Sequence, residues 1–124
     1  MTELYKNAFI RIEAEPAGIP WLKVFTLDGC REFSQCSDET RAEVWRVLHI
    51  LEKGMLDFYQ PTKMNLASFA NYLPVVHWHV MARFESDSHF PEPMWGAQQR
   101  DSTIGFAPLS DFIETVRAEL DGVS

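Results

Sequence analysis

No stretch of the sequence is apolar for long enough to cross a membrane. A spanning helix needs about 20 consecutive apolar residues, and every apolar run here is interrupted by polar residues well before that length. The first residues, MTELYKNAF, also lack the apolar core of a signal peptide. We therefore expect a cytoplasmic protein with no membrane partner.

Cysteine is scarce, with only Cys30 and Cys36 in the chain. Their spacing in CREFSQC matches neither a CxxC redox pair nor a four-ligand zinc pattern. Disulfides are uncommon in proteins that carry no secretion signal. We interpret both side chains as ordinary thiols, and a disulfide between them is the alternative.

Basic residues are outnumbered, since 11 lysines and arginines face 18 aspartates and glutamates, which gives a net charge of −7. Such a field repels nucleic acid and anionic lipid, so a phosphate group would need a local site. Apolar residues make up 46% of the 124 residues, which is typical of a globular protein. The length predicts one domain, residues 1–124.

Period-two alternation and turn formers predict four strands. The segments AFIRIEAE and WLKVFTL flank a turn rich in proline and glycine at residues 16–20. The segments 63–71 (KMNLASFAN) and 75–84 (VVHWHVMARF) follow each other closely, which predicts an antiparallel hairpin. We expect loops over DGCREFSQC and over the polar, proline-punctuated stretch after Phe84.

Two helices are predicted from apolar stripes. Val44, Leu48, Leu51, Met55 and Phe58 recur at helical spacing within 39–59, with Ser37 or Asp38 as N-cap. Gly54 interrupts that helix unfavourably, because glycine costs about 1 kcal/mol relative to alanine in a helix. The segment 109–120 has a second stripe, with Ser110 as its expected cap.

The segment VVHWHVMARF carries two histidines on one face. Successive strand residues point to opposite sides, so His77, His79 and Arg83 share one face, and Trp78 and Val80 lie on the other. Two imidazoles so close can serve one small ligand. Either one attacks phosphorus while the other donates to the developing charge, or both bind a metal together with Glu85 or His89.

These residues resemble the histidine triad (HIT) family, whose signature is His-φ-His-φ-His-φ-φ, with φ apolar. The matching stretch is VVHWHVM, followed by Ala82 and Arg83, with an asparagine-bearing strand upstream and the loop HFPEPMWG downstream. This order is similar to that of a bacterial HIT subgroup related to diadenosine polyphosphate hydrolases. The resemblance implies an α+β fold: an antiparallel sheet, one long helix and a C-terminal helix.

The resemblance also assigns roles to residues. It implies that His77 is the nucleophile and that His79 contacts the scissile phosphate, while Val75 replaces the first histidine of the signature. Phosphate binding is expected from Asn65, Asn71 and Arg83, ribose binding from Glu13 or Glu15, and base binding from Phe9, Ile10, Ile19 and Trp21.

The activity implied is hydrolysis or transfer at the α-phosphate of an adenine or guanine nucleotide, through a nucleotidyl-histidine. Dinucleoside polyphosphates and nucleoside phosphoramidates are the candidate substrates, with no metal or other cofactor. The resemblance further implies a homodimer, with which the aromatic residues Phe90, Trp95 and Phe106 are compatible. The alternative is an inactive nucleotide sensor or interaction module, because Val75 can neither donate nor accept a hydrogen bond through its side chain.

Overall fold

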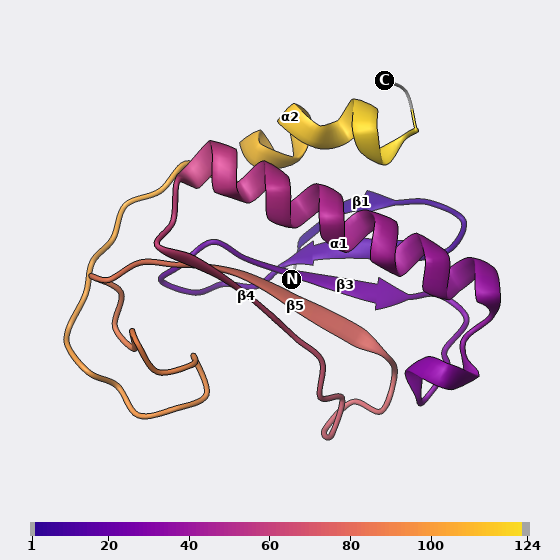
Figure 1. Cartoon of the computed structure of the whole chain (residues 1–124), viewed down its shortest axis with the longest axis horizontal. Helices are drawn as coiled ribbons and strands as arrows, with labels where there is room; N and C mark the ends of the chain where they lie inside the picture. The colour runs from indigo at the N-terminus through magenta and orange to yellow at the C-terminus, as the bar shows by residue number, and fades with distance from the viewer. Residues whose placement is uncertain (1, 123–124) are drawn as a thin grey trace.

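A computed structural model describes residues 2–122 and shows the predicted α+β architecture (Figure 1). Five antiparallel strands form one sheet in the order β1-β2-β3-β5-β4. In chain order the elements are β1 (Thr2–Lys6), β2 (Ile10–Ala14), β3 (Trp21–Thr26), the 3₁₀ helix η1 (Phe33–Gln35), α1 (Asp38–Tyr59), β4 (Lys63–Ala67), β5 (His77–Arg83) and α2 (Leu109–Leu120).

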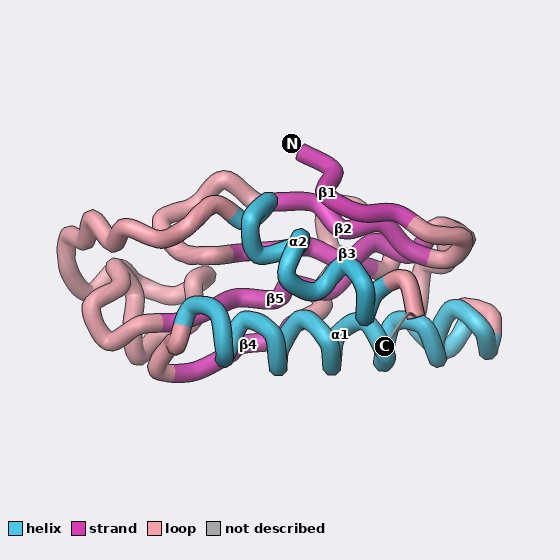
Figure 2. The backbone as a smooth tube through the Cα atoms, turned by 90° about the horizontal axis from the view of Figure 1, so that it is seen from above, coloured by secondary structure: helices cyan, strands magenta, loops and turns pink. Residues whose placement is uncertain are grey.

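Both helices pack on the same face of the sheet (Figures 1 and 2). Alternate strand residues such as Ile12, Val24 and Val80 join the stripe of α1 in one buried core, to which α2 adds Phe112 and Val116. The other residues of the central strands point to the opposite face, as alternation requires. That opposite face carries the two histidines.

Helix α1 has the predicted cap and stripe. The hydroxyl of Ser37 accepts a hydrogen bond from the Thr40 backbone N–H, so Ser37 is the N-cap. The helix ends at Tyr59, after which Gln60 adopts a left-handed conformation at φ 49° and Pro61 follows. The expected cap of α2 is wrong, because α2 begins at Leu109 after Pro108 and Ser110 lies within its first turn.

The strands differ from prediction at their ends. Strand β1 was not predicted, since it is a short edge strand in which only Tyr5 is buried, so its sequence carries little alternation. Strand β4 stops at Ala67 rather than residue 71, and β5 spans His77–Arg83 rather than 75–84. Between them Ala70 adopts a positive φ of 56°, which turns the chain out of the sheet.

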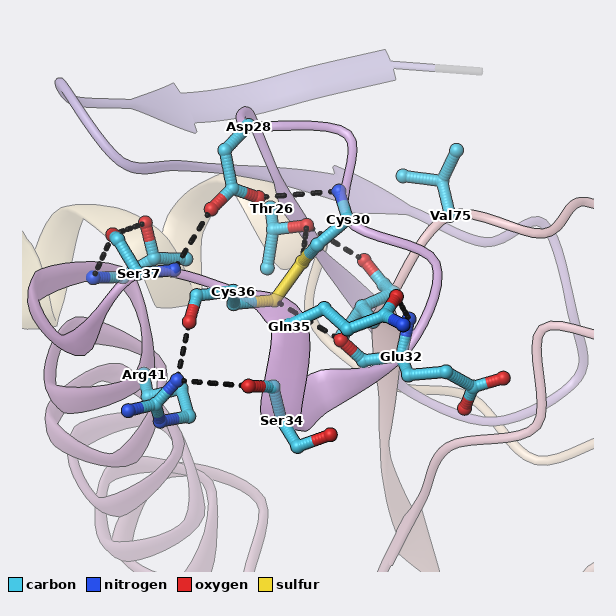
Figure 3. Close-up of a disulfide and its surroundings, with 12 residues drawn as sticks. Thr26, Asp28, Cys30, Glu32, Ser34, Gln35, Cys36, Ser37, Arg41 and Val75 are labelled. Atoms are coloured by element: carbon cyan, nitrogen blue, oxygen red, sulfur yellow. Dashed lines mark hydrogen bonds between the residues drawn. A yellow bond between two sulfur atoms is a disulfide. The ribbon is translucent and has the colours of Figure 1, made fainter.

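The expectation of two free thiols is wrong, because Cys30 and Cys36 form a disulfide (Figure 3). It closes the segment that links β3 to α1 and contains η1. Gly29 takes a positive φ of 70° just before Cys30, and the Cα atoms of the two cysteines lie 5.3 Å apart. Sequence spacing alone did not reveal that proximity. Within residues 2–122, no helix is both long enough and apolar enough to span a bilayer.

Gly54 lies where the two helices meet. A Cβ atom at this position would lie 2.7 Å from Cγ1 of Val116 and 3.1 Å from Cε1 of Phe112. Both neighbours are buried, so neither can move aside freely. The glycine that weakens the helical pattern therefore allows α2 to pack closely on α1.

We expect Gly54→Ala to destabilise the protein although alanine favours helix. Overpacking costs about 1–3 kcal/mol, which exceeds the gain of about 1 kcal/mol in helix propensity. Urea unfolding measures the difference, with Lys53→Ala at an exposed position of the same helix as control. A Gly54→Ala variant at least as stable as the wild type would show that the helices are not in tight contact here.

Candidate active site

The pairing of β3 with β5 arranges the candidate residues in rows across the sheet. Phe25 lies opposite His77, and Lys23 lies opposite His79. Strand β2 extends these rows, because Arg11 pairs with Phe25 and Glu13 with Lys23. All of these side chains point away from the helices.

A cavity of about 620 Å³ opens over these rows. Its lining comes from β3 and β5, from the connections between β2 and β3 and between β4 and β5, and from the loop after β5. The lining residues are Glu15, Trp21, Lys23, Phe25, Phe69, Ala70, Asn71, Tyr72, Leu73, His77, His79 and Trp95. The cavity thus brings together five of the residues that the sequence proposed for the site: His77, His79, Asn71, Glu15 and Trp21.

His77 is fixed in one tautomer by the backbone. Its Nδ1 lies 2.8 Å from the carbonyl oxygen of Val75, and a carbonyl oxygen only accepts hydrogen bonds. Nδ1 therefore carries the hydrogen, and in the neutral ring Nε2 keeps its lone pair. The residue is 9% exposed and its ring stacks on Phe25 with centroids 4.9 Å apart, which restricts rotation of the ring.

His79 is fixed in the opposite tautomer. The indole Nε1 of Trp21 donates to Nδ1 of His79 at 3.0 Å, and an indole N–H can only donate. Nδ1 is therefore unprotonated, and in the neutral ring the hydrogen is on Nε2. The two imidazole centroids are 5.2 Å apart, so one ring offers a lone pair beside a second ring that offers a donor.

Burial also keeps His79 neutral. Desolvation is the main cause that lowers the pKa of His79 to about 4, and the nearby His77 and Lys23 lower it further. Glu15 acts in the other direction without reversing the shift. The hydrogen on Nε2 is thus that of a neutral imidazole across the ordinary pH range.

Trp95 closes one side of the cavity. Its ring centroid lies 4.8 Å from that of His79, 5.4 Å from that of Trp21 and 4.9 Å from that of Phe69. Trp95 belongs to the loop HFPEPMWG and is one of the aromatic residues compatible with the homodimer that the resemblance implies. In this chain the side chain lines its own pocket and remains 49% exposed.

Lys23 is a site residue that the sequence analysis missed. Its Nζ lies 2.8 Å from Oε2 of Glu15, and both side chains line the cavity. The pair places one cation and one carboxylate near the imidazoles. The sequence contains the information needed to include Lys23, because the alternation in WLKVF puts Lys23 on the same face as Trp21.

Arg83 and Asn65 do not line this cavity. Arg83 is 1% exposed and forms two hydrogen bonds with the carboxylate of Asp87, at 2.8 and 3.0 Å. It also donates to Oδ1 of Asn65 at 2.9 Å and to the carbonyl of Glu92 at 2.7 Å. Arg83 is thus held in a buried cluster beside the pocket, where it anchors the loop after β5, and half-buried Asn65 accepts one of its hydrogen bonds.

Asp87 is ionised in that cluster. Its burial alone would raise the pKa of the carboxyl, but Arg83 and the backbone N–H groups of Phe84, His89 and Phe90 outweigh burial. Together they hold the pKa of Asp87 well below its usual range. The ion pair is therefore present whenever the protein is folded near neutral pH.

The other candidates for base and ribose binding lie elsewhere. Ile10 and Ile19 are buried, and Phe9 borders a different cavity near the end of β1. Glu13 is 8% exposed and accepts a hydrogen bond from Arg11, while its Oε1 has no partner among the described residues. Of this group only Trp21 borders the cavity, together with Glu15.

The structure does not bring together the residues of the alternative metal site. That site requires Glu85 or His89 beside His77 and His79. Within residues 2–122, neither joins the two histidines in a group of potential ligand atoms. The group that does form is Asp28 with the two cysteines, whose sulfurs are bonded to each other.

Solved structures share this arrangement of elements, although no family model and no curated protein matches the sequence. A histidine triad protein from Marinobacter aquaeolei VT8 aligns with a TM-score of 0.75 at 20% identity, over 99% of this chain and 90% of that one. A histidine triad protein from Bradyrhizobium japonicum aligns with a TM-score of 0.74 at 18% identity, over the same shares of the two chains. The chain has the histidine triad fold.

A third match agrees. The histidine triad protein from Sinorhizobium meliloti 1021 gives a TM-score of 0.71 at 18% identity, over 98% of this chain and 88% of that one. The histidine triad fold predicted from VVHWHVM is thus confirmed at the level of fold. At these identities the likeness concerns architecture, so the chemistry must be argued from the site itself.

Asp87→Asn should strongly destabilise the protein. The substitution leaves the guanidinium of Arg83 buried without a counter-charge, which typically costs about 3–5 kcal/mol. Denaturant unfolding measures the loss. Glu114→Gln is the matched control, because it removes the partner of Arg117 in an exposed pair, and such pairs contribute about 0–1 kcal/mol. Equal effects of the two substitutions would contradict the buried role of Asp87.

Stability should fall as pH is lowered from about 6.5 to about 4, in part because of His79. Between these values the unfolded chain binds a proton at His79 that the folded protein does not, so acid favours unfolding. The variant His79→Gln, whose amide oxygen can still accept from Trp21, should lose less stability over this interval. His49→Gln on the exposed side of α1 serves as control, and an unchanged slope in His79→Gln would refute the assignment.

Proposed function

We propose that the chain is a member of the histidine triad family that binds a nucleotide and cleaves it at the α-phosphate. The observation that carries the proposal is the pair of opposite tautomers in one cavity. His77 presents an unprotonated Nε2, and His79 presents a protonated Nε2. A nucleophile beside a hydrogen-bond donor is what in-line attack on phosphorus requires.

In the proposed reaction the lone pair on Nε2 of His77 forms a bond to the α-phosphorus. The bond from phosphorus to the leaving group breaks, and its electron pair remains on the leaving atom. His79 donates its Nε2 hydrogen toward that atom or a phosphoryl oxygen. Water or another acceptor then displaces His77 from the nucleotidyl intermediate.

Valine at position 75 preserves the hydrogen bond that orients the proposed nucleophile, His77. The partner of His77 Nδ1 is the carbonyl of residue 75, which every amino acid supplies. As the ring becomes cationic on attack, the bond from Nδ1–H to this carbonyl strengthens. Replacement of the first histidine of the signature by valine therefore removes a side chain but not this contact.

The remaining lining suits a nucleotide. Glu15 can accept hydrogen bonds from ribose hydroxyls, and Trp21 and its aromatic neighbours offer faces for an adenine or guanine base. Asn71 offers an amide donor and Lys23 a cation for phosphate oxygens. Dinucleoside polyphosphates and nucleoside phosphoramidates both present the required α-phosphate, and we extend the proposal to a homodimer.

Nucleotide binding without turnover is the second candidate. It is favoured by the placement of Arg83 and Asn65 outside the cavity, where Arg83 donates hydrogen bonds to Asp87 and to Oδ1 of Asn65. A site with fewer phosphate donors stabilises a transition state less well. Single-turnover assays with a fluorescent nucleoside phosphoramidate and with diadenosine tetraphosphate distinguish the two candidates.

His77→Ala should abolish the nucleotidyl intermediate, because it removes the attacking atom. His79→Ala should retain the intermediate and slow turnover by about a hundredfold or more, the effect of losing one transition-state donor. Acid-quenched protein analysed by mass spectrometry detects the adduct, and AMP titration shows whether each variant still binds. Full activity of His77→Ala on every substrate that the wild type cleaves would reject the mechanism.

A further inference from the structure

The peptide group between Val75 and Val76 is held at both ends. At one end the Val75 carbonyl accepts the hydrogen of His77 Nδ1 at 2.8 Å. At the other end the Val76 N–H donates to the carbonyl of Cys30 at 2.9 Å. Because a peptide group is planar, a rotation that breaks one of these hydrogen bonds also disturbs the other.

Thr26 holds the next carbonyl along the chain. Its backbone N–H and its hydroxyl both donate to the carbonyl of Val76, each at 3.2 Å. Thr26 is 2% exposed and Val76 is 3% exposed, so water does not compete for these groups. The backbone just before His77 is thus fixed from the end of β3 and from the segment that follows it.

The disulfide ties Cys30 to the start of α1. Cys36 directly precedes the N-cap Ser37, and the guanidinium of Arg41 donates to the Cys36 carbonyl. Figure 3 shows the bond between this helix end and Cys30, with Val75 in the segment that leads into β5. A continuous path therefore runs from α1 through Cys36 and Cys30 to the peptide group that orients His77.

We propose that the Cys30–Cys36 disulfide positions His77, so that reduction of this bond by a dithiol lowers the activity of the site. The part concerning activity rests on the proposed function. The part concerning the orientation of His77 rests on the hydrogen bonds alone. In this role Cys30 and Cys36 are positioning residues, because they act on His77 through the Val75–Val76 peptide group.

Reduction is an ordinary exchange with a dithiol. A thiolate of the reductant attacks one sulfur, the Cys30–Cys36 bond breaks, and a mixed disulfide forms. The second thiol of the reductant then displaces the protein sulfur and becomes the oxidised partner, while two protons end on the protein thiols. Attack at Cys30 is favoured, because Cys36 is only 3% exposed and Cys30 is less buried.

Loss of the bond must move Cys30 or Cys36. Two thiol sulfurs cannot remain at covalent distance, so they separate to van der Waals contact. Cys36 is held next to the capped end of α1, whereas Cys30 follows the turn at Gly29. The displacement therefore falls mainly on Cys30, whose carbonyl holds the Val75–Val76 peptide group.

The test compares oxidised wild type, wild type reduced with dithiothreitol, and the double variant Cys30→Ser/Cys36→Ser. The first readout is the ¹⁵N NMR signature of His77, which reports the ring tautomer and the hydrogen bond from Nδ1 independently of activity. The second is kcat and KM on a nucleoside phosphoramidate. Melting temperatures confirm that all three forms are folded.

We expect reduction to populate the second tautomer of His77 and to lower kcat by about tenfold or more, the usual scale for loss of a group that orients a reacting side chain. KM should stay within about twofold, because His79 and the aromatic lining are unchanged. The double variant should match reduced wild type and should not respond to dithiothreitol, which excludes effects of the reductant elsewhere.

The outcomes separate this inference from the proposed function. An identical His77 spectrum in oxidised and reduced protein would overturn the positioning role, even if the protein is an active hydrolase. Absence of turnover in every form would reject the proposed cleavage and leave nucleotide binding alone, whereas a redox-dependent His77 spectrum would still support the positioning role. Equal kcat in both redox states of an active protein would overturn the claim about activity.

Discussion

The antiparallel register of β3 on β5 is the constraint on which the site depends. It places Phe25 opposite His77 and Lys23 opposite His79, and it brings the indole of Trp21 within hydrogen-bonding distance of His79. A slip of one residue would turn both histidines toward α1 and the buried core. The core residues on the helix-facing side, such as Val24 and Val80, oppose such a slip because it would expose them.

Within that register, the two imidazoles are distinguished by neighbours that can form only one kind of hydrogen bond. A backbone carbonyl can only accept, so it places the hydrogen of His77 on Nδ1. An indole N–H can only donate, so Nδ1 of His79, which accepts from it, is unprotonated. Neither assignment depends on a charged group. The two rings of one strand therefore present different Nε2 atoms, one with a lone pair and one with a hydrogen, from adjacent positions on the same face.

The sequence predicts the parts of this arrangement that depend on local periodicity. Alternation in VVHWHVMARF places His77 and His79 together, and the apolar stripe locates α1 within one residue of its observed start. It does not predict the disulfide, because the contact of Cys30 with Cys36 depends on the path of an irregular segment that contains η1 and has no periodicity. The sequence also does not predict that Arg83 is buried, since alternation alone cannot show that a later loop covers that end of the strand.

The Arg83 cluster connects these observations to the cavity. The sequence assigned this arginine to phosphate, yet its guanidinium binds Asp87 and the carbonyl of Glu92. Asp87 in turn accepts hydrogen bonds from three backbone N–H groups of the same loop. Glu92 lies three residues before Trp95, whose ring packs against His79. A buried ion pair at the C-terminal end of β5 therefore fixes the loop that packs against the imidazoles near the N-terminal end of β5. Arg83 thus helps to shape the cavity although it does not line it.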